Sequence, residues 1–97
     1  MDGAGVVSLG LGGELDIATS GELRDRLKEL AAAPGKSVVI DLRWLEFIDS
    51  SGVRELIRAV SWARRDGWSL TFDDTVGPQV LRVIDLLGLR DLLWPPG

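Results

Sequence analysis

The sequence predicts an α/β fold in which amphipathic helices pack against a mixed β-sheet. Apolar residues alternate with a period of two in some segments and recur every three or four residues in others. The two kinds of segment take turns along the chain, and glycine and proline residues separate them. Because a chain of 97 residues with 45% hydrophobic residues supports one core, we expect residues 1–97 to form a single domain.

The first segment has the period of a β-strand. Val7, Leu9 and Leu11 share one face of residues 6–11. The glycines at 12–13 are expected to end this strand, because they interrupt the alternation. We therefore predict a short strand with one apolar face.

The next segment has the spacing of a helix. Its apolar residues at i, i+4 and i+7 are Leu23, Leu27 and Leu30, with charged residues on the opposite side. Thr19 is followed three residues later by Glu22, which is the arrangement of a capping box at a helix start. Pro34 and Gly35 are expected to stop the helix.

A β-branched run at residues 38–42 predicts the central strand, and its near-continuous apolar character is typical of a strand covered on both faces. After a connection over residues 43–49, helical spacing predicts a second helix that begins near Ser50 and ends before Gly67. Residues 69–72 then read as a further strand, parallel to the central one.

The last third of the chain predicts one more helix and a final strand. Pro78 suits the first turn of a helix, and apolar residues continue at helical spacing to Gly88. The tail at residues 89–94 is expected to add a short edge strand before the two prolines that follow.

Composition excludes several classes of function. The chain has no Cys and no His, so the usual zinc ligands and the common nucleophile–base pairs are missing. A net charge of −4 argues against nucleic acid and anionic membranes as partners. No apolar run approaches the ~20 residues that span a bilayer, and no basic leader precedes the first segment. We expect a cytoplasmic protein.

The strongest functional signal joins the central strand to the second helix. It reads Val-Val-Ile-Asp-Leu at residues 38–42 and Phe-Ile-Asp-Ser-Ser-Gly at residues 47–52. This combination resembles the signature of STAS domains, especially those of bacterial anti-sigma-factor antagonists. The resemblance extends upstream to Gly-Glu-Leu-Asp at residues 13–16 with Thr19, and downstream to residues 80–93.

The resemblance implies a STAS-type mixed sheet and a binding module that is not an enzyme and needs no cofactor or metal. In such antagonists, a partner that is both a serine kinase and an anti-sigma factor phosphorylates the first serine of Asp-Ser-Ser-Gly, here Ser50. The unmodified protein binds this kinase and displaces the sigma factor. Phosphorylation releases the protein, and a serine phosphatase resets the cycle. We expect a monomer in its free form.

Physical chemistry independently makes Ser50 a suitable switch. Free N–H groups and the helix dipole at a helix N-terminus accommodate an anion at a gain of about 0.3 to 1 kcal/mol. A phosphoryl group adds about −1.5 to −2 charge beside Asp49, and a like-charge contact across an interface costs several kcal/mol. Partner binding is therefore expected to suffer far more than folding.

Five further residues are candidate partner contacts: Asp16, Thr19, Asp49, Ser51 and Gly52. The family places the loop that contains Asp16 beside the serine-bearing loop, and a residue without Cβ at position 52 would let a partner's backbone approach closely. Structural roles compete with each assignment. Asp and Ser residues are favoured helix caps, and Thr19 with Glu22 is explained by capping alone.

The remaining charged and aromatic residues have ordinary explanations. The arginines of the second helix, namely Arg54, Arg58, Arg64 and Arg65, are interpreted as a solvated face. The four tryptophans are interpreted as core or groove residues: Trp44, Trp62, Trp68 and Trp94. Gly10 and Gly12 do not form a dinucleotide loop, because the third glycine position is occupied by Leu15.

Two other functions stay open at this point. A non-switching STAS scaffold would be a subunit of a transport or stress-signalling complex, and it would associate with a transport ATPase instead of a kinase. The second alternative, weak nucleotide binding or hydrolysis by the domain itself, would appear as ATP or GTP binding at millimolar concentration.

Overall fold

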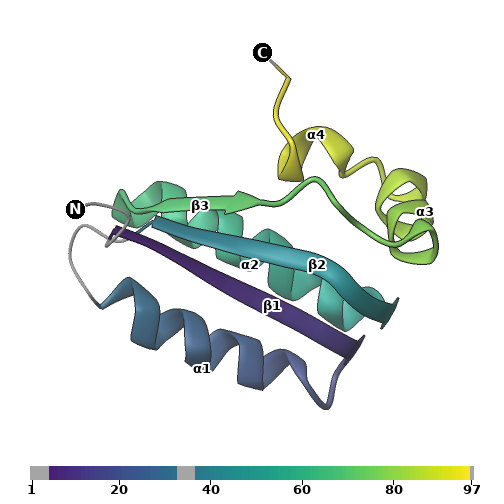
Figure 1. Cartoon of the computed structure of the whole chain (residues 1–97), viewed down its shortest axis with the longest axis horizontal. Helices are drawn as coiled ribbons and strands as arrows, with labels where there is room; N and C mark the ends of the chain where they lie inside the picture. The colour runs from purple at the N-terminus through teal and green to yellow at the C-terminus, as the bar shows by residue number, and fades with distance from the viewer. Residues whose placement is uncertain (1–4, 33–36, 97) are drawn as a thin grey trace.

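The computed structural model describes residues 5–32 and 37–96. The order of elements along these residues is β1 (Val6–Leu15), α1 (Ser20–Ala31), β2 (Ser37–Ile48), α2 (Ser50–Asp66), β3 (Ser69–Phe72), α3 (Pro78–Leu86) and α4 (Arg90–Leu93). Strands and helices alternate from β1 to α3, which confirms the predicted α/β class (Figure 1).

The sheet has the order β1-β2-β3, with β2 in the centre as predicted. Val7 pairs with Val38 in β2, and Ile40 pairs with Phe72 in β3, both in parallel register. Two strand–helix–strand units explain this, because a crossover helix returns the chain to the same end of the sheet. The described sheet is thus parallel throughout, whereas a mixed sheet was predicted.

The tail accounts for that difference. Residues 89–94 were predicted to add an edge strand, but the structure places helix α4 there. Leu89, Leu92 and Leu93 follow a helical i, i+3, i+4 spacing, and Leu93 is buried. The tail therefore forms a helix that packs these leucines against the core, and it adds no strand to the sheet.

Within the residues that the structure describes, one face of the sheet is deeply covered and the other is not. Val38, Ile40 and Leu42 of β2 are buried at 1%, 0% and 0% exposure, whereas Val39 and Asp41 between them are half-buried. Burial therefore alternates with the period of two, and the prediction that helices cover this strand on both faces is wrong. Helices α1 and α2 lie along the same side of the sheet (Figure 1).

Both long strands extend beyond their predicted ends. β1 continues through Gly12 and Gly13, with register shifts on either side of them, and Gly13 adopts a positive φ of 71°. β2 continues through the predicted connection as far as Ile48. The bulges absorb residues that break the alternation, so the strand persists where the pattern fails.

The predicted ends of the helices are mostly confirmed. α2 begins at Ser50 and ends at Asp66, before Gly67, whose φ of 77° is the left-handed conformation that glycine favours. Pro78 occupies the first turn of α3 as predicted. α1 ends at Ala31, and the predicted stop at Pro34 and Gly35 lies outside the described residues.

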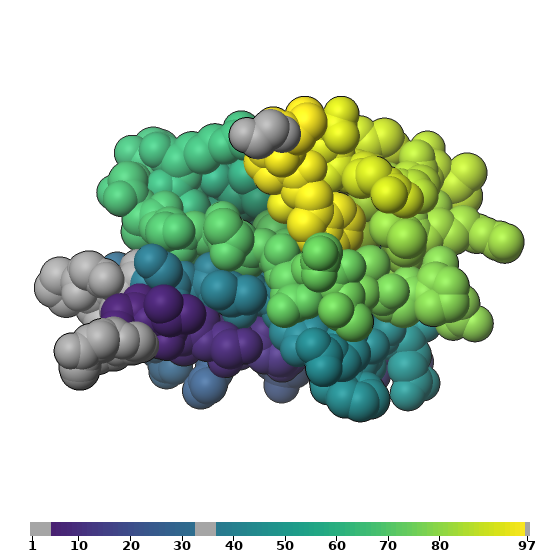
Figure 2. All heavy atoms as spheres, turned by 45° about the horizontal axis from the view of Figure 1, so that its top comes forward, coloured from purple at the N-terminus to yellow at the C-terminus, as the bar shows by residue number. Residues whose placement is uncertain are grey.

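The C-terminal segment packs beside β3. The indole nitrogen of Trp94 donates to the carbonyl oxygen of Phe72 at 3.2 Å. In the space-filling view this segment, in yellow, lies against the green middle of the chain and away from β1, in purple (Figure 2). Trp44 does not follow the prediction for the tryptophans, because it is 67% exposed on β2.

Candidate functional site

Ser50 is the first residue of α2 and is exposed. The preceding residue, Asp49, is the N-cap, and its carboxylate accepts a hydrogen bond from the backbone N–H of Gly52 at 3.0 Å. The backbone N–H groups of Ser50 and Ser51 have no acceptor within the helix, because the first turn offers none. The predicted cap at Asp49 is confirmed, and it leaves the Ser50 hydroxyl accessible.

Gly52 is buried, and its neighbour is the chain itself. A Cβ atom at this position would lie 2.3 Å from the carbonyl oxygen of Leu15 and 2.9 Å from Cγ1 of Ile48. Real Cβ atoms do not approach backbone that closely, so the end of β1 requires glycine here. The proposed reason for Gly52, close approach by a partner's backbone, is therefore replaced by an internal contact.

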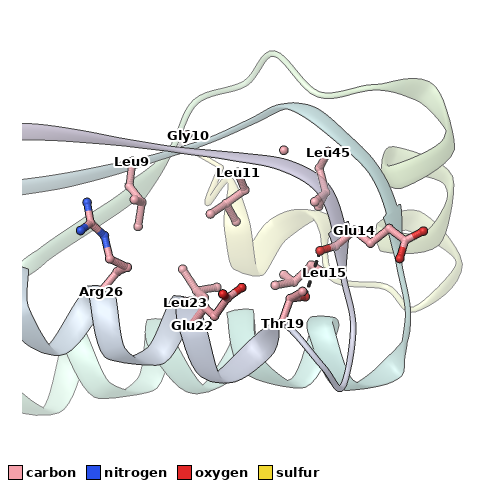
Figure 3. A pocket seen from close by; sticks show the side chains of 11 residues that line it. Leu9, Gly10, Leu11, Glu14, Leu15, Thr19, Glu22, Leu23, Arg26 and Leu45 are labelled. Atoms are coloured by element: carbon pink, nitrogen blue, oxygen red, sulfur yellow. Dashed lines mark hydrogen bonds between the residues drawn. The ribbon is translucent and has the colours of Figure 1, made fainter.

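The β1–α1 loop at residues 16–19 is held by side-chain hydrogen bonds. The Asp16 carboxylate accepts from the backbone N–H groups of Ala18, at 2.9 Å, and Thr19, at 3.1 Å. The Thr19 hydroxyl donates to the carbonyl oxygen of Glu14 at 2.9 Å, as the dashed line in Figure 3 shows, and accepts from the Asp16 N–H.

These bonds overturn the predicted capping box. Thr19 is the N-cap of α1, but its side chain makes no cap hydrogen bond, because the hydroxyl is directed to the loop. Glu22 instead lines a hollow between β1 and α1 (Figure 3). Among the predicted site residues, only Thr19 lines that hollow.

The structure brings the two loops together. The backbone N–H of Asp49 donates to the carbonyl oxygen of Leu15 at 3.2 Å. Asp16 directly follows Leu15, so the sequence-predicted residues of both loops form one end of the molecule. The resemblance implied that these two segments lie side by side, and the structure confirms this.

The two adjacent serines line different hollows. Ser50 lines an apolar hollow formed with Val53 and Ile57 of α2 and with Leu87 and Leu89 beyond α3. Leu87 is 53% exposed, so this hollow presents apolar surface to solvent. No pattern in the sequence predicts this hollow, because Leu87 lies far from Ser50 along the chain.

Ser51 lines a polar hollow between α1 and α2. Arg24 of α1 and Arg54, Glu55 and Arg58 of α2 also line it. Glu55 is only 3% exposed and accepts a hydrogen bond from the Arg24 guanidinium at 2.7 Å. This hydrogen bond raises the pKa of Arg24, with a further contribution from the charge of Glu55. Sequence analysis missed the pair, because 31 residues separate its members.

The described residues contain no group of three side chains suited to hold a metal ion. Within the same residues, no helix is both long and apolar enough to cross a membrane. The candidate site is a surface made of the β1–α1 loop, the start of α2, an apolar hollow and a polar hollow.

Comparison with known proteins identifies the fold and its family. Residues 2–94 match the sequence model of a family described as "Mlab, STAS domain". The chain belongs to the STAS domain family. The predicted resemblance is thereby confirmed over nearly the whole sequence.

Two relatives carry names that describe regulators. The anti-sigma-F factor antagonist RsfB of Mycobacterium tuberculosis is 34% identical over 89 residues, which are 91% of this chain and 70% of RsfB. An anti-sigma F factor antagonist of Paenibacillus polymyxa is 33% identical over 90 residues, 92% of this chain and 76% of the relative. These STAS proteins are named as regulatory binding proteins and not as enzymes, in agreement with the sequence prediction.

Solved structures show the same fold. A sulfate transporter family protein from Wolinella succinogenes has a TM-score of 0.75 at 16% identity, covering 93% of this chain and 72% of its own. The anti-sigma factor antagonist SpoIIAA in its unphosphorylated form has a TM-score of 0.65 at 20% identity, covering 89% and 78%. At these identities the likeness concerns the fold alone.

Proposed function

We propose that this STAS protein is a cytoplasmic anti-sigma-factor antagonist controlled by phosphorylation of Ser50. In its unmodified state it binds an anti-sigma serine kinase and displaces the sigma factor. The kinase transfers the γ-phosphoryl group of ATP to Ser50: an Oγ–P bond forms, the bond to ADP breaks, and the hydroxyl proton leaves to a base of the kinase. A serine phosphatase restores the binding state.

The observation that carries this proposal is the position of Ser50. The residue is exposed at the first position of a 17-residue helix, at the edge of an apolar hollow with an exposed leucine. A kinase reaches such a hydroxyl without unfolding the domain. The names of the relatives supply the class of partner, an anti-sigma factor.

The energetics favour a switch in binding over a change in stability. The free N–H groups of the helix start stabilise a phosphate by about 0.3 to 1 kcal/mol. On a partner's surface, the same group brings about −1.5 to −2 charge next to Asp49 and covers the rim of the apolar hollow. A loss of only about 1.4 kcal/mol in binding free energy already weakens the affinity tenfold.

Asp16, Thr19 and Ser51 are proposed as partner contacts, because the loops that carry them adjoin Ser50 at one end of the molecule. The first two also hold their own loop. Asp49 and Gly52 contribute by fixing the start of α2, which positions Ser50.

The test is phosphorylation of the purified protein by its cognate anti-sigma kinase with ATP, followed by mapping of the modified residue by mass spectrometry. We expect one phosphate on Ser50, no labelling of Ser50→Ala and normal labelling of Ser51→Ala. Labelling of Ser50→Ala equal to that of the wild type would refute the site. Copurification with a transport ATPase in place of a kinase would favour the non-switching scaffold.

A further inference from the structure

One cation lines the same hollow as Ser50. Arg54 is one helical turn further along α2, at the i+4 position, and both side chains line the apolar hollow beside Leu87 and Leu89. Side chains on a helix lean toward its N-terminus, so the guanidinium of Arg54 can reach the Ser50 end of the helix. Arg54 is also exposed, and its side chain can therefore adjust to a new partner at little cost.

The other arginines near Ser50, Arg24 and Arg58, do not line its hollow. The guanidinium of Arg24 is held by Glu55 at 2.7 Å. Arg58 lines the hollow between α1 and α2 and not the one beside Ser50, which lies two helical turns away. Among the ion pairs found within residues 5–32 and 37–96, none involves Arg54. Arg54 also borders the α1–α2 hollow, so it stands on the ridge between the two hollows.

The carboxylate next to Ser50 is also held by a hydrogen bond within the protein. The Asp49 carboxylate accepts the N–H of Gly52 and caps the helix, so it is fixed beside Ser50 and repels a phosphate placed there. A phosphoserine at position 50 therefore has a fixed negative neighbour on one side. On the other side it has the guanidinium of Arg54, which makes no ion pair within the part of the chain that the structure describes. Arginine binds phosphate oxygens in a two-pronged geometry that stabilises the dianion.

We propose that Arg54 is the intramolecular ligand of the phosphate on Ser50. This inference rests on Ser50 as the modified residue of the proposed function, and it names a regulatory residue of that site. Phosphorylation then does two things at the partner-binding end of the molecule. It adds negative charge there, and it draws Arg54 away from the hollow between α1 and α2, which loses one of its cations.

The experiment installs phosphoserine genetically at position 50 of the full chain, so that no kinase is needed. The second pKa of the phosphate is measured by phosphorus-31 NMR titration in the wild type, in Arg54→Gln and in the matched control Arg58→Gln. A neighbouring cation favours the dianion and lowers this pKa. We expect Arg54→Gln to raise it by about 0.2 to 0.4 pH unit, the effect of one exposed i,i+4 ion pair. Arg58→Gln should leave it within error of the wild type.

An unchanged phosphate pKa in Arg54→Gln would overturn the inference. So would an equal shift in both variants, because it would show a general effect of helix charge without a specific ligand. The thermal midpoint of each unphosphorylated variant reports any structural damage separately. Because the phosphate is installed without a kinase, this result stands apart from whether a kinase recognises Ser50.

Discussion

The two strand-to-helix junctions at the candidate site differ in how they are built. The β1–α1 junction is a four-residue loop over residues 16–19, held by the side chains of Asp16 and Thr19. The β2–α2 junction is a single residue, Asp49, which caps the helix through Gly52. The first loop is thus stabilised from within, whereas the second depends on close packing against the first.

This difference explains why Ser50 is exposed although its backbone is held in a fixed position. A one-residue junction leaves no loop to cover the helix start, so the Ser50 hydroxyl is exposed. The start of α2 is fixed against β1, because the Asp49 N–H and Gly52 both contact the Leu15 carbonyl. The first two predictions below test this difference and the third tests another junction of the molecule, from the largest expected effect to the smallest.

The largest effect is expected from Gly52→Ala. The added Cβ would lie 2.3 Å from the Leu15 carbonyl oxygen, so β1 and α2 must separate. We expect a loss of about 2 kcal/mol or more in the free energy of unfolding, measured by urea denaturation. Gly21→Ala in α1 is the matched control. A Cβ there meets nothing within 4 Å, and the helix gains up to about 1 kcal/mol. Equal stability of the two variants would contradict the close-packed junction.

Next in size is the contrast between Asp16→Ala and Asp49→Ala. The Asp16 carboxylate accepts two backbone N–H groups, and the Asp49 carboxylate accepts one. We expect losses in unfolding free energy of about 2 kcal/mol for Asp16→Ala and about 1 kcal/mol for Asp49→Ala. Asp16→Asn keeps the accepting oxygen and should recover part of the loss. A larger loss of unfolding free energy for Asp49→Ala than for Asp16→Ala would contradict this account, because it would show that the β2–α2 junction depends more on its side-chain hydrogen bond than the β1–α1 loop does.

The smallest effect concerns a third junction, between α3 and α4, which an ion pair spans. Arg90 donates to the Asp85 carboxylate at 2.6 Å, and this hydrogen bond lowers the pKa of Asp85. Because the folded-state pKa lies below the unfolded one, the stabilisation is present above about pH 4 and is lost as the pH falls through the folded-state value. Asp85→Asn should therefore lower the thermal midpoint slightly at pH 7, and the difference from the wild type should shrink as the pH falls below about 4.

Arg90→Gln should remove the same pH-dependent part of the stability. The side chains of both partners are well exposed, so added salt should shrink the effect of either substitution. A difference from the wild type that persists unchanged at pH 2 would show that the pair acts through packing and not through charge.

Sequence periodicity was sufficient for most of the fold. α2, β3 and α3 have regular spacing and clear end signals, and their predicted ranges are confirmed. β1 and β2 were predicted too short, because bulges allow a strand to continue through residues that break the alternation. The tail was predicted as a strand, but Leu89, Leu92 and Leu93 have helical spacing, and the prolines that follow end a strand and a helix alike.

At the candidate site, local signals predicted local features only. The cap at Asp49 follows from three neighbouring residues and is confirmed. The capping box at Thr19 is wrong, because the Thr19 hydroxyl accepts from the Asp16 N–H and donates to the Glu14 carbonyl, both in the loop before the helix. The reason for Gly52 and the burial of Glu55 both depend on residues more than 30 positions away, which no single-sequence pattern reports.

The central claim is that phosphorylation of Ser50 controls binding to an anti-sigma factor. The most direct measurement is calorimetric titration of the cognate anti-sigma factor with the unmodified protein and with the protein that carries phosphoserine at position 50. We predict that the phosphorylated form binds at least about tenfold more weakly, which corresponds to about 1.4 kcal/mol, while its thermal midpoint stays within a few degrees of the unmodified form. Equal affinity of the two folded forms would contradict the account.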